Sequence, residues 1–105
     1  MKLKKYIILC LITSLTGGLS AQKTMTGIEV LKKDNFKILE RKRVGLITNP
    51  TGVDNSLKST IDILFEAPNV NLVALYGPEH GVRGDVHAGD KVENSTDPST
   101  GLPVY

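Results

Sequence analysis

The chain has 105 residues, with 13 lysine and arginine side chains against 11 aspartate and glutamate side chains, a formal net charge of +2. Three of the basic residues, Lys2, Lys4 and Lys5, lie at the extreme N-terminus. Without them, ten basic side chains remain against 11 acidic ones, a net charge of −1. The apparent basic balance therefore comes from the N-terminus and gives no indication of nucleic-acid binding, so we expect no nucleic-acid partner. The single cysteine, Cys10, also excludes an internal disulfide.

Residues 1–21 have the organisation of a secretory signal peptide. A basic start is followed by the apolar run Tyr6–Leu15 and then by Ser20-Ala21, a small-residue cleavage site. The apolar run is shorter than the roughly 20 residues of a membrane-spanning helix. We therefore expect a periplasmic or secreted protein, cut after Ala21, with no stable membrane insertion after removal of the signal.

The remainder, residues 22–105, starts with a helical pattern and a strand. Thr26–Leu39 has an approximate helical spacing of apolar residues among charged ones. Val44–Thr48 is a short apolar run that indicates a buried strand. The sequence Asn49-Pro50-Thr51-Gly52 directly after it is a strong turn signal.

A second helix follows the turn. Apolar residues at the spacing i, i+4, i+7 and i+8 predict an amphipathic helix; they are Leu57, Ile61, Leu64 and Phe65. We expect a side chain among residues 54–56 (Asp54, Asn55 or Ser56) to cap the start of this helix and Pro68 to close its end.

The apolar run Leu72–Tyr76 predicts a second buried strand, so the order is strand, helix, strand. Such a βαβ unit makes the two strands parallel. Both strands are apolar throughout, which predicts helices on both faces of the sheet. After Asp85 the sequence is polar and rich in turn formers, and we predict no regular structure there. Gly101–Tyr105, at the end of this stretch, is a turn leading into another apolar run. We expect residues 22–105 to be the incomplete, N-terminal part of an α/β, Rossmann-like domain with a parallel sheet.

The expected sheet has one edge suited to ligand binding. In a parallel sheet the C-terminal ends of the strands lie on the same edge, where ligands tend to bind. The loops leaving that edge are Asn49–Asp54 and Gly77–Asp85, both polar and punctuated by glycine. Candidate functional residues should therefore come from these two loops.

Glu79 and His80 lie between two glycines directly after the second strand. A carboxylic acid near the end of a buried strand is partly desolvated, which raises its pKa towards that of a general acid. Glu79 is therefore a candidate catalytic acid; alternatively it caps a turn or pairs with Arg83. His80 is a candidate second acid–base group or donor to a ligand oxygen, or else a structural histidine.

Three further residues on these loops have alternative roles. Arg83 can clamp a carboxylate with its planar fork of donors, or form a salt bridge to Asp85 or Glu79. Asp85 is a candidate partner acid or a group that orients His80. Asn49 can bond sugar hydroxyls, although Asn before Pro-Thr-Gly is also ordinary turn chemistry.

The sequence has partial signals for a metal site and for a phosphate site. Ligand-type side chains stand close together at His80, Asp85, His87 and Asp90. They match no motif of defined geometry, so a metal-dependent hydrolase remains only an alternative. The glycine spacing of the second loop is not that of a dinucleotide- or phosphate-binding loop. We expect no metal and no cofactor.

Three blocks of the sequence, in order, resemble the NamZ-type exo-β-N-acetylmuramidases, a family of bacterial glycoside hydrolases that act on peptidoglycan. The blocks are Arg43–Asp54 (RVGLITNPTGVD), Leu75–Asp85 (LYGPEHGVRGD) and Thr100–Tyr105 (TGLPVY). The resemblance covers about Gly27–Tyr105. Family members are several times longer than this chain, so it resembles only their N-terminal part.

The resemblance implies a larger two-domain enzyme, with a Rossmann-like N-terminal domain, a smaller C-terminal domain and an active site in the cleft between them. It implies removal of terminal N-acetylmuramic acid from the non-reducing end of peptidoglycan fragments, and a 105-residue piece that is itself inactive. Glu79 occupies the position of the family's proposed catalytic acid. The residues implied to bind substrate or support the site are Asn49, His80, Arg83 and Asp85.

Two questions stay open at the level of the sequence. Glycoside hydrolysis usually needs two carboxyl groups. The second catalytic group is either Asp85, or a residue beyond Tyr105, or the acetamido group of the substrate. A non-catalytic cell-wall-binding module is the other alternative, although the absence of tryptophan argues against a sugar-stacking platform.

Overall fold

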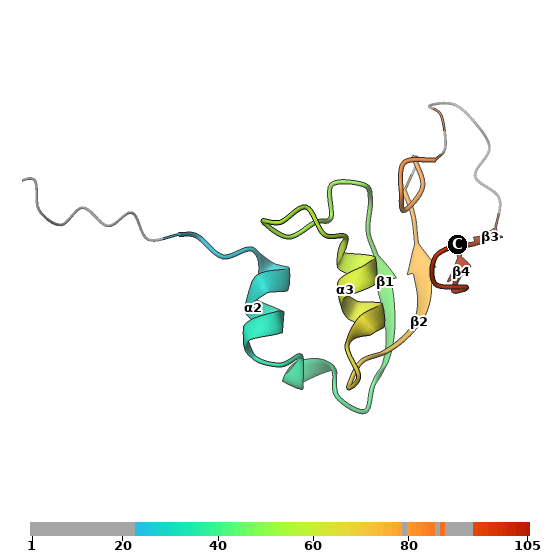
Figure 1. Cartoon of the computed structure of the whole chain (residues 1–105). Helices are drawn as coiled ribbons and strands as arrows, with labels where there is room; N and C mark the ends of the chain where they lie inside the picture. The colour runs from blue at the N-terminus through green and yellow to red at the C-terminus, as the bar shows by residue number, and fades with distance from the viewer. Residues whose placement is uncertain (1–22, 79, 86, 88–93) are drawn as a thin grey trace, which may run out of the picture.

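The structure is a computed structural model that describes residues 23–78, 80–85, 87 and 94–105 (Figure 1). Its elements in chain order are α2 (Gly27–Lys33), the 3-10 helix η1 (Lys37–Leu39), β1 (Arg43–Ile47), α3 (Thr60–Glu66), β2 (Asn71–Tyr76), β3 (Ser95–Thr96) and β4 (Pro103–Val104). The expected signal peptide, residues 1–21, lies outside the described residues. Within the described part, no helix combines the length and the apolar character needed to cross a membrane.

The sheet is mixed, and its centre is parallel. β1 and β2 pair in parallel, with Val44 opposite Leu72 and Leu46 opposite Leu75. α3 connects these two strands (Figure 1), so the predicted βαβ unit and the α/β class are confirmed. β4 pairs in parallel with β2 on its other side, and β3 pairs antiparallel with β4, giving the order β1-β2-β4-β3.

The prediction of no regular structure after Asp85 is wrong for β3 and for β4, the second of which forms in the apolar run that follows the Gly101 turn. Each of these strands has only two residues. So short a strand is stabilised by its partner strands rather than by its own sequence pattern. In β4, Val104 pairs with Leu75 of β2, which is distant in the sequence.

The N-terminal helical pattern forms two short helices instead of one. The backbone N–H of Thr26 donates to the carboxylate of Glu29 (2.8 Å), which caps α2 at its start. Asn35 and Phe36 have φ angles of 50° and 54°, a left-handed conformation that ends the helix. The reversal turns Phe36 into the core, where it is buried.

α3 begins later than predicted, and none of the three expected caps is used. Ser59 is the N-cap, and its hydroxyl accepts from the N–H of Ile61 (3.2 Å). Asp54 instead accepts from the N–H groups of Ser56 and Lys58, which builds a turn before the helix. This turn excludes Leu57 from α3 and leaves it 80% exposed, so its predicted place on the buried helix face is wrong.

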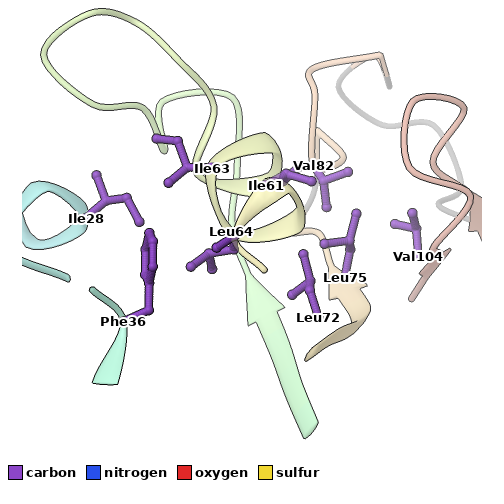
Figure 2. Packing of buried hydrophobic residues seen from close by; sticks show 10 residues of the cluster. Ile28, Phe36, Ile61, Ile63, Leu64, Leu72, Leu75, Val82 and Val104 are labelled. Atoms are coloured by element: carbon purple, nitrogen blue, oxygen red, sulfur yellow. The ribbon is translucent and has the colours of Figure 1, made fainter. Parts of the chain in front are cut away.

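The core lies on one face of the sheet. α3 contributes Ile61, Ile63 and Leu64. Ile61 lies on the side of Leu72 and Leu75 of β2, and Ile63 lies on the side of Ile28 and Phe36 (Figure 2). Side chains from α2, from the turn after it, from the loop after β2 and from β4 complete the cluster; they are Ile28, Phe36, Val82 and Val104.

The opposite face of the sheet is open over β1 and the end of β2. Ile47 is 79% exposed, and the exposed ring of Tyr76 stacks on that of Tyr105, with 5.6 Å between ring centroids. The prediction of helices on both faces is therefore wrong for the described residues, among which only α3 and α2 cover the sheet, on one side (Figure 1). β1 is apolar on this second face as well, but the described residues do not bury it.

Candidate functional site

The loops after β1 and β2 meet at the edge where both strands end. Between them lies a pocket of about 400 Å³, lined by Asn49, Pro50, Thr51, Pro78 and His80. The pocket thus brings together Asn49 and His80, which are far apart in the sequence. The pairing of β1 with β2 continues to the start of the first loop, because the N–H of Thr48 donates to the carbonyl oxygen of Tyr76 (3.0 Å).

The side chain of Asn49 makes the turn and also lines the pocket. Its Oδ1 accepts from the backbone N–H of Thr51 (3.1 Å) and from the Thr51 hydroxyl (2.8 Å). The N–H of Gly52 donates to the Asn49 carbonyl oxygen (3.0 Å), which closes the turn. The acceptor of this amide is therefore engaged within the loop, and its Nδ2 is the part suited to donate to a ligand oxygen.

The second wall of the pocket is a turn between Pro78 and Gly81, closed by the N–H of Gly81 donating to the Pro78 carbonyl oxygen (2.8 Å). His80 is exposed in this wall. Glu79, the predicted catalytic acid, lies outside the described residues. Both of its neighbours in the sequence, Pro78 and His80, line the pocket.

Arg83 lies between two carboxylates. Its Nε and Nη2 donate to the two carboxylate oxygens of Asp97 (2.5 and 3.0 Å), and its Nη2 and Nη1 donate to those of Asp62 (2.8 and 3.3 Å). The bonds to Asp97, and then those to Asp62, raise the pKa of the guanidinium above its ordinary value. The sequence suggested Asp85 or Glu79 as its partner; the partners found are Asp62 and Asp97.

The other ligand-type side chains that the structure describes do not gather into a site. Asp85 and His87 are exposed. Among the residues that the structure describes, no three His, Cys, Asp or Glu side chains are grouped so as to hold a metal ion. Asp90, the fourth member of the predicted set, lies outside them.

Sequence analysis missed Asp62 and Asp97. Asp97 is 2% exposed and accepts from the N–H (3.0 Å) and the hydroxyl (2.6 Å) of Thr100 in addition to Arg83. These bonds, the one from Arg83 first, lower the pKa of the Asp97 carboxyl. The Asp-Pro-Ser-Thr-Gly sequence at Asp97–Gly101 is a turn signature that identifies Asp97 as a capping side chain, but it contains no sign of a pairing with Arg83.

Known proteins resemble this chain in sequence and in fold. Residues 44–105 match the sequence profile of the family described as exo-β-N-acetylmuramidase NamZ, N-terminal. The chain is 59% identical over 83 residues to the peptidoglycan β-N-acetylmuramidase NamZ of Bacillus subtilis, a match that covers 79% of this chain and 20% of the relative.

Two solved structures of DUF1343 family proteins from Bacteroides fragilis share the fold. One is 79% identical with a TM-score of 0.68, covering 77% of this chain and 19% of that one; the other is 36% identical with a TM-score of 0.60, covering 79% and 20%. The chain thus spans about a fifth of the length of the relatives it matches. Because the family profile covers more than half of its residues, and because both loops of the pocket lie within that match, the chain belongs to the exo-β-N-acetylmuramidase NamZ family.

Proposed function

We propose that this chain carries the catalytic acid of a glycoside hydrolase, and that the complete gene product removes terminal N-acetylmuramic acid from the non-reducing end of peptidoglycan fragments. The observation that carries the proposal is the pocket at the sheet edge, because both of its walls come from loops within the family match. The relative that is 59% identical to this chain is named as a peptidoglycan β-N-acetylmuramidase.

Glu79 is the proposed general acid. It stands in the sequence between two residues that line the pocket, and it would protonate the oxygen of the leaving group as the glycosidic bond breaks. The Nδ2 of Asn49 would donate to a sugar hydroxyl, and His80 would donate to a ligand oxygen. The second catalytic group is one of three candidates. It is either Asp85, or a residue that does not belong to this chain, or the acetamido group of the substrate.

Export to the periplasm or the medium is part of the proposal, since intact peptidoglycan lies outside the cytoplasmic membrane. The support is the signal-peptide organisation of residues 1–21. Mass spectrometry of the protein from a periplasmic fraction should find Gln22 as the first residue. A chain that retains Met1 in the cytoplasmic fraction would contradict export.

The catalytic role is tested by Glu79→Gln in the complete gene product, assayed on a chromogenic N-acetylmuramic acid glycoside. Loss of a general acid should lower kcat by about 10²–10⁴-fold, with the melting temperature unchanged. Glu66→Gln is the matched control, because Glu66 is an exposed residue of α3 that pairs with Lys58. Near-normal turnover by Glu79→Gln would remove Glu79 from the mechanism.

A further inference from the structure

The loop after β2 contacts the rest of the fold both before and after the residues that form the pocket wall. At its start, the N–H of Gly77 donates to the carbonyl oxygen of Tyr105 (3.0 Å). Past the wall, Val82 is 6% exposed and belongs to the core. Further along, the backbone of Gly84 lies against the ring of Pro50. The described residues of the wall, Pro78, His80 and Gly81, therefore lie between points at which the chain contacts the rest of the fold.

Arg83 is a charged residue between two of these points, Val82 and Gly84. Its side chain binds two other parts of the fold at once. Asp62 belongs to the first turn of α3, and Asp97 to the turn that joins β3 to β4. Each carboxylate accepts two hydrogen bonds from the guanidinium. Four bonds of this kind occupy most of the five N–H donors of an arginine. A carboxylate of a substrate would have to displace one of these aspartates to bind here.

The two aspartates differ in burial. The side chain of Asp97 is 1% exposed, whereas that of Asp62 is 34% exposed and that of Arg83 is 25% exposed. Removing the charge of a buried, hydrogen-bonded partner costs much more than removing an exposed one. The contact between Arg83 and Asp97 should therefore matter more for the loop than the contact between Arg83 and Asp62.

We propose that Arg83 is a positioning residue, which holds the described residues of the pocket wall (Pro78, His80 and Gly81) in place by bridging Asp97 and Asp62, and that it does not bind the substrate carboxylate. The consequence for catalysis rests on the proposed function, whereas the consequence for the loop does not. In the complete enzyme, the carboxylate of a muramic acid substrate would then need a different cationic partner.

The test uses Arg83→Lys, Asp97→Asn and Asp62→Asn in the complete gene product. Lysine keeps the charge but cannot grip two carboxylates bidentately. Misplacement of the wall should lower kcat by about 10–100-fold while KM changes by less than about threefold. The order of effect should be Arg83→Lys and Asp97→Asn first, then Asp62→Asn. Arg43→Lys, at the exposed start of β1 and away from the pocket, is the matched control.

Amide hydrogen exchange gives a second readout that needs no substrate. The amide of Gly81, bonded to Pro78, should exchange faster in Arg83→Lys, while the amide of Thr48, which pairs β1 with β2, should not change. A raised KM with unchanged kcat and unchanged Gly81 exchange would show that Arg83 binds substrate and would overturn the proposal. Unchanged values of all three would overturn it as well.

Two further outcomes are separable. If the unmodified gene product fails to cleave the glycoside, the proposed function fails, and Gly81 exchange still decides the positioning role. If Arg83→Lys does not fold, Asp62→Asn decides by the same readouts, because it leaves the pair of Arg83 with Asp97 intact. Equal acceleration of Gly81 and Thr48 exchange in Asp62→Asn would mean a general loss of stability and would overturn the proposal.

Discussion

Gly84 and Pro50 join the two loops of the pocket. Gly84 has a φ of +80°, and a Cβ atom at its position would lie 2.9 Å from the Cγ of Pro50. The contact is closer than real Cβ atoms adopt, so the glycine permits the two loops to approach. The width of the pocket is therefore tied to the absence of a side chain at position 84.

The first prediction concerns this contact. Gly84→Ala should lower the free energy of unfolding by about 1–3 kcal/mol, because alanine is strained at positive φ and its methyl group pushes Pro50 away. Gly101→Ala is the matched control, since Gly101 has a φ of +73° with nothing within 4 Å. Denaturant unfolding of both variants separates backbone strain from the contact. Equal losses in the two variants would show that the contact with Pro50 contributes nothing.

The second prediction contrasts two apolar residues that the sequence places on one helix face. Ile61 is fully buried, so Ile61→Ala should cost about 2–5 kcal/mol of unfolding free energy. Leu57 is exposed with a φ of 64°, so Leu57→Gly should relieve strain and change stability by anything from zero to a gain of about 1 kcal/mol. Thermal or denaturant unfolding measures both. A large loss in Leu57→Gly would place Leu57 in the core after all.

The third prediction separates the two roles of Asn49. Asn49→Asp keeps an oxygen that accepts from the Thr51 N–H and hydroxyl, so the turn and the melting temperature should be retained. It removes the Nδ2 donor, so turnover of the muramic acid glycoside should fall by about tenfold. Asn49→Ala should lose both turnover and stability. Full activity of Asn49→Asp would leave Asn49 with the turn alone.

The fourth prediction concerns acid stability. Asp54 is buried and accepts from the Ser56 hydroxyl first, then from the Lys58 backbone and the Lys32 ammonium group, which together hold its pKa well below the ordinary 3.8. A carboxyl whose pKa is depressed by folding stabilises the fold fully above its unfolded pKa and less as the pH falls through its folded pKa. Unfolding free energy should therefore decline below about pH 3.8.

In Asp54→Asn this acid-dependent decline should be shallower, and the protein should be less stable at neutral pH. Asp34→Asn, at the exposed end of α2, is the control and should leave the pH profile unchanged. Urea unfolding between pH 2 and pH 7 measures both profiles. Parallel profiles for wild type and Asp54→Asn would remove Asp54 as the source of the acid sensitivity.

The four predictions above concern the complete gene product, whereas the fifth concerns residues 22–105 in isolation. The exposed side chains of Ile47, Tyr76 and Tyr105 form an apolar part of the sheet surface, and β1 is an edge strand of the sheet that the described residues form. We expect a broad transition with no cooperative unfolding, together with self-association. Circular dichroism and tyrosine fluorescence during urea unfolding test this expectation. A single coincident transition at both probes would contradict it.

Several features followed from the sequence alone because they depend on neighbouring residues. Apolar runs predicted β1 and β2, and the spacing of Ile61 and Leu64 predicted α3. A helix between two strands then implies parallel pairing and a common edge for the loops that follow them. Asn49 and His80 were placed at one site on this argument, and the structure brings both of them to one pocket.

Other features depended on contacts between distant residues, which no local pattern records. The start of α3 changed because Asp54 satisfies nearby backbone donors and builds a turn there. Arg83 was expected to pair with a near neighbour in sequence or with a ligand, but the folded chain brings Asp62 and Asp97 to it. Sequence therefore determined which loops meet at the pocket, through periodicity and turn chemistry. Only the tertiary structure decided which of their side chains are taken up by the fold, because hydrogen bonds and ion pairs form between whichever groups packing brings together.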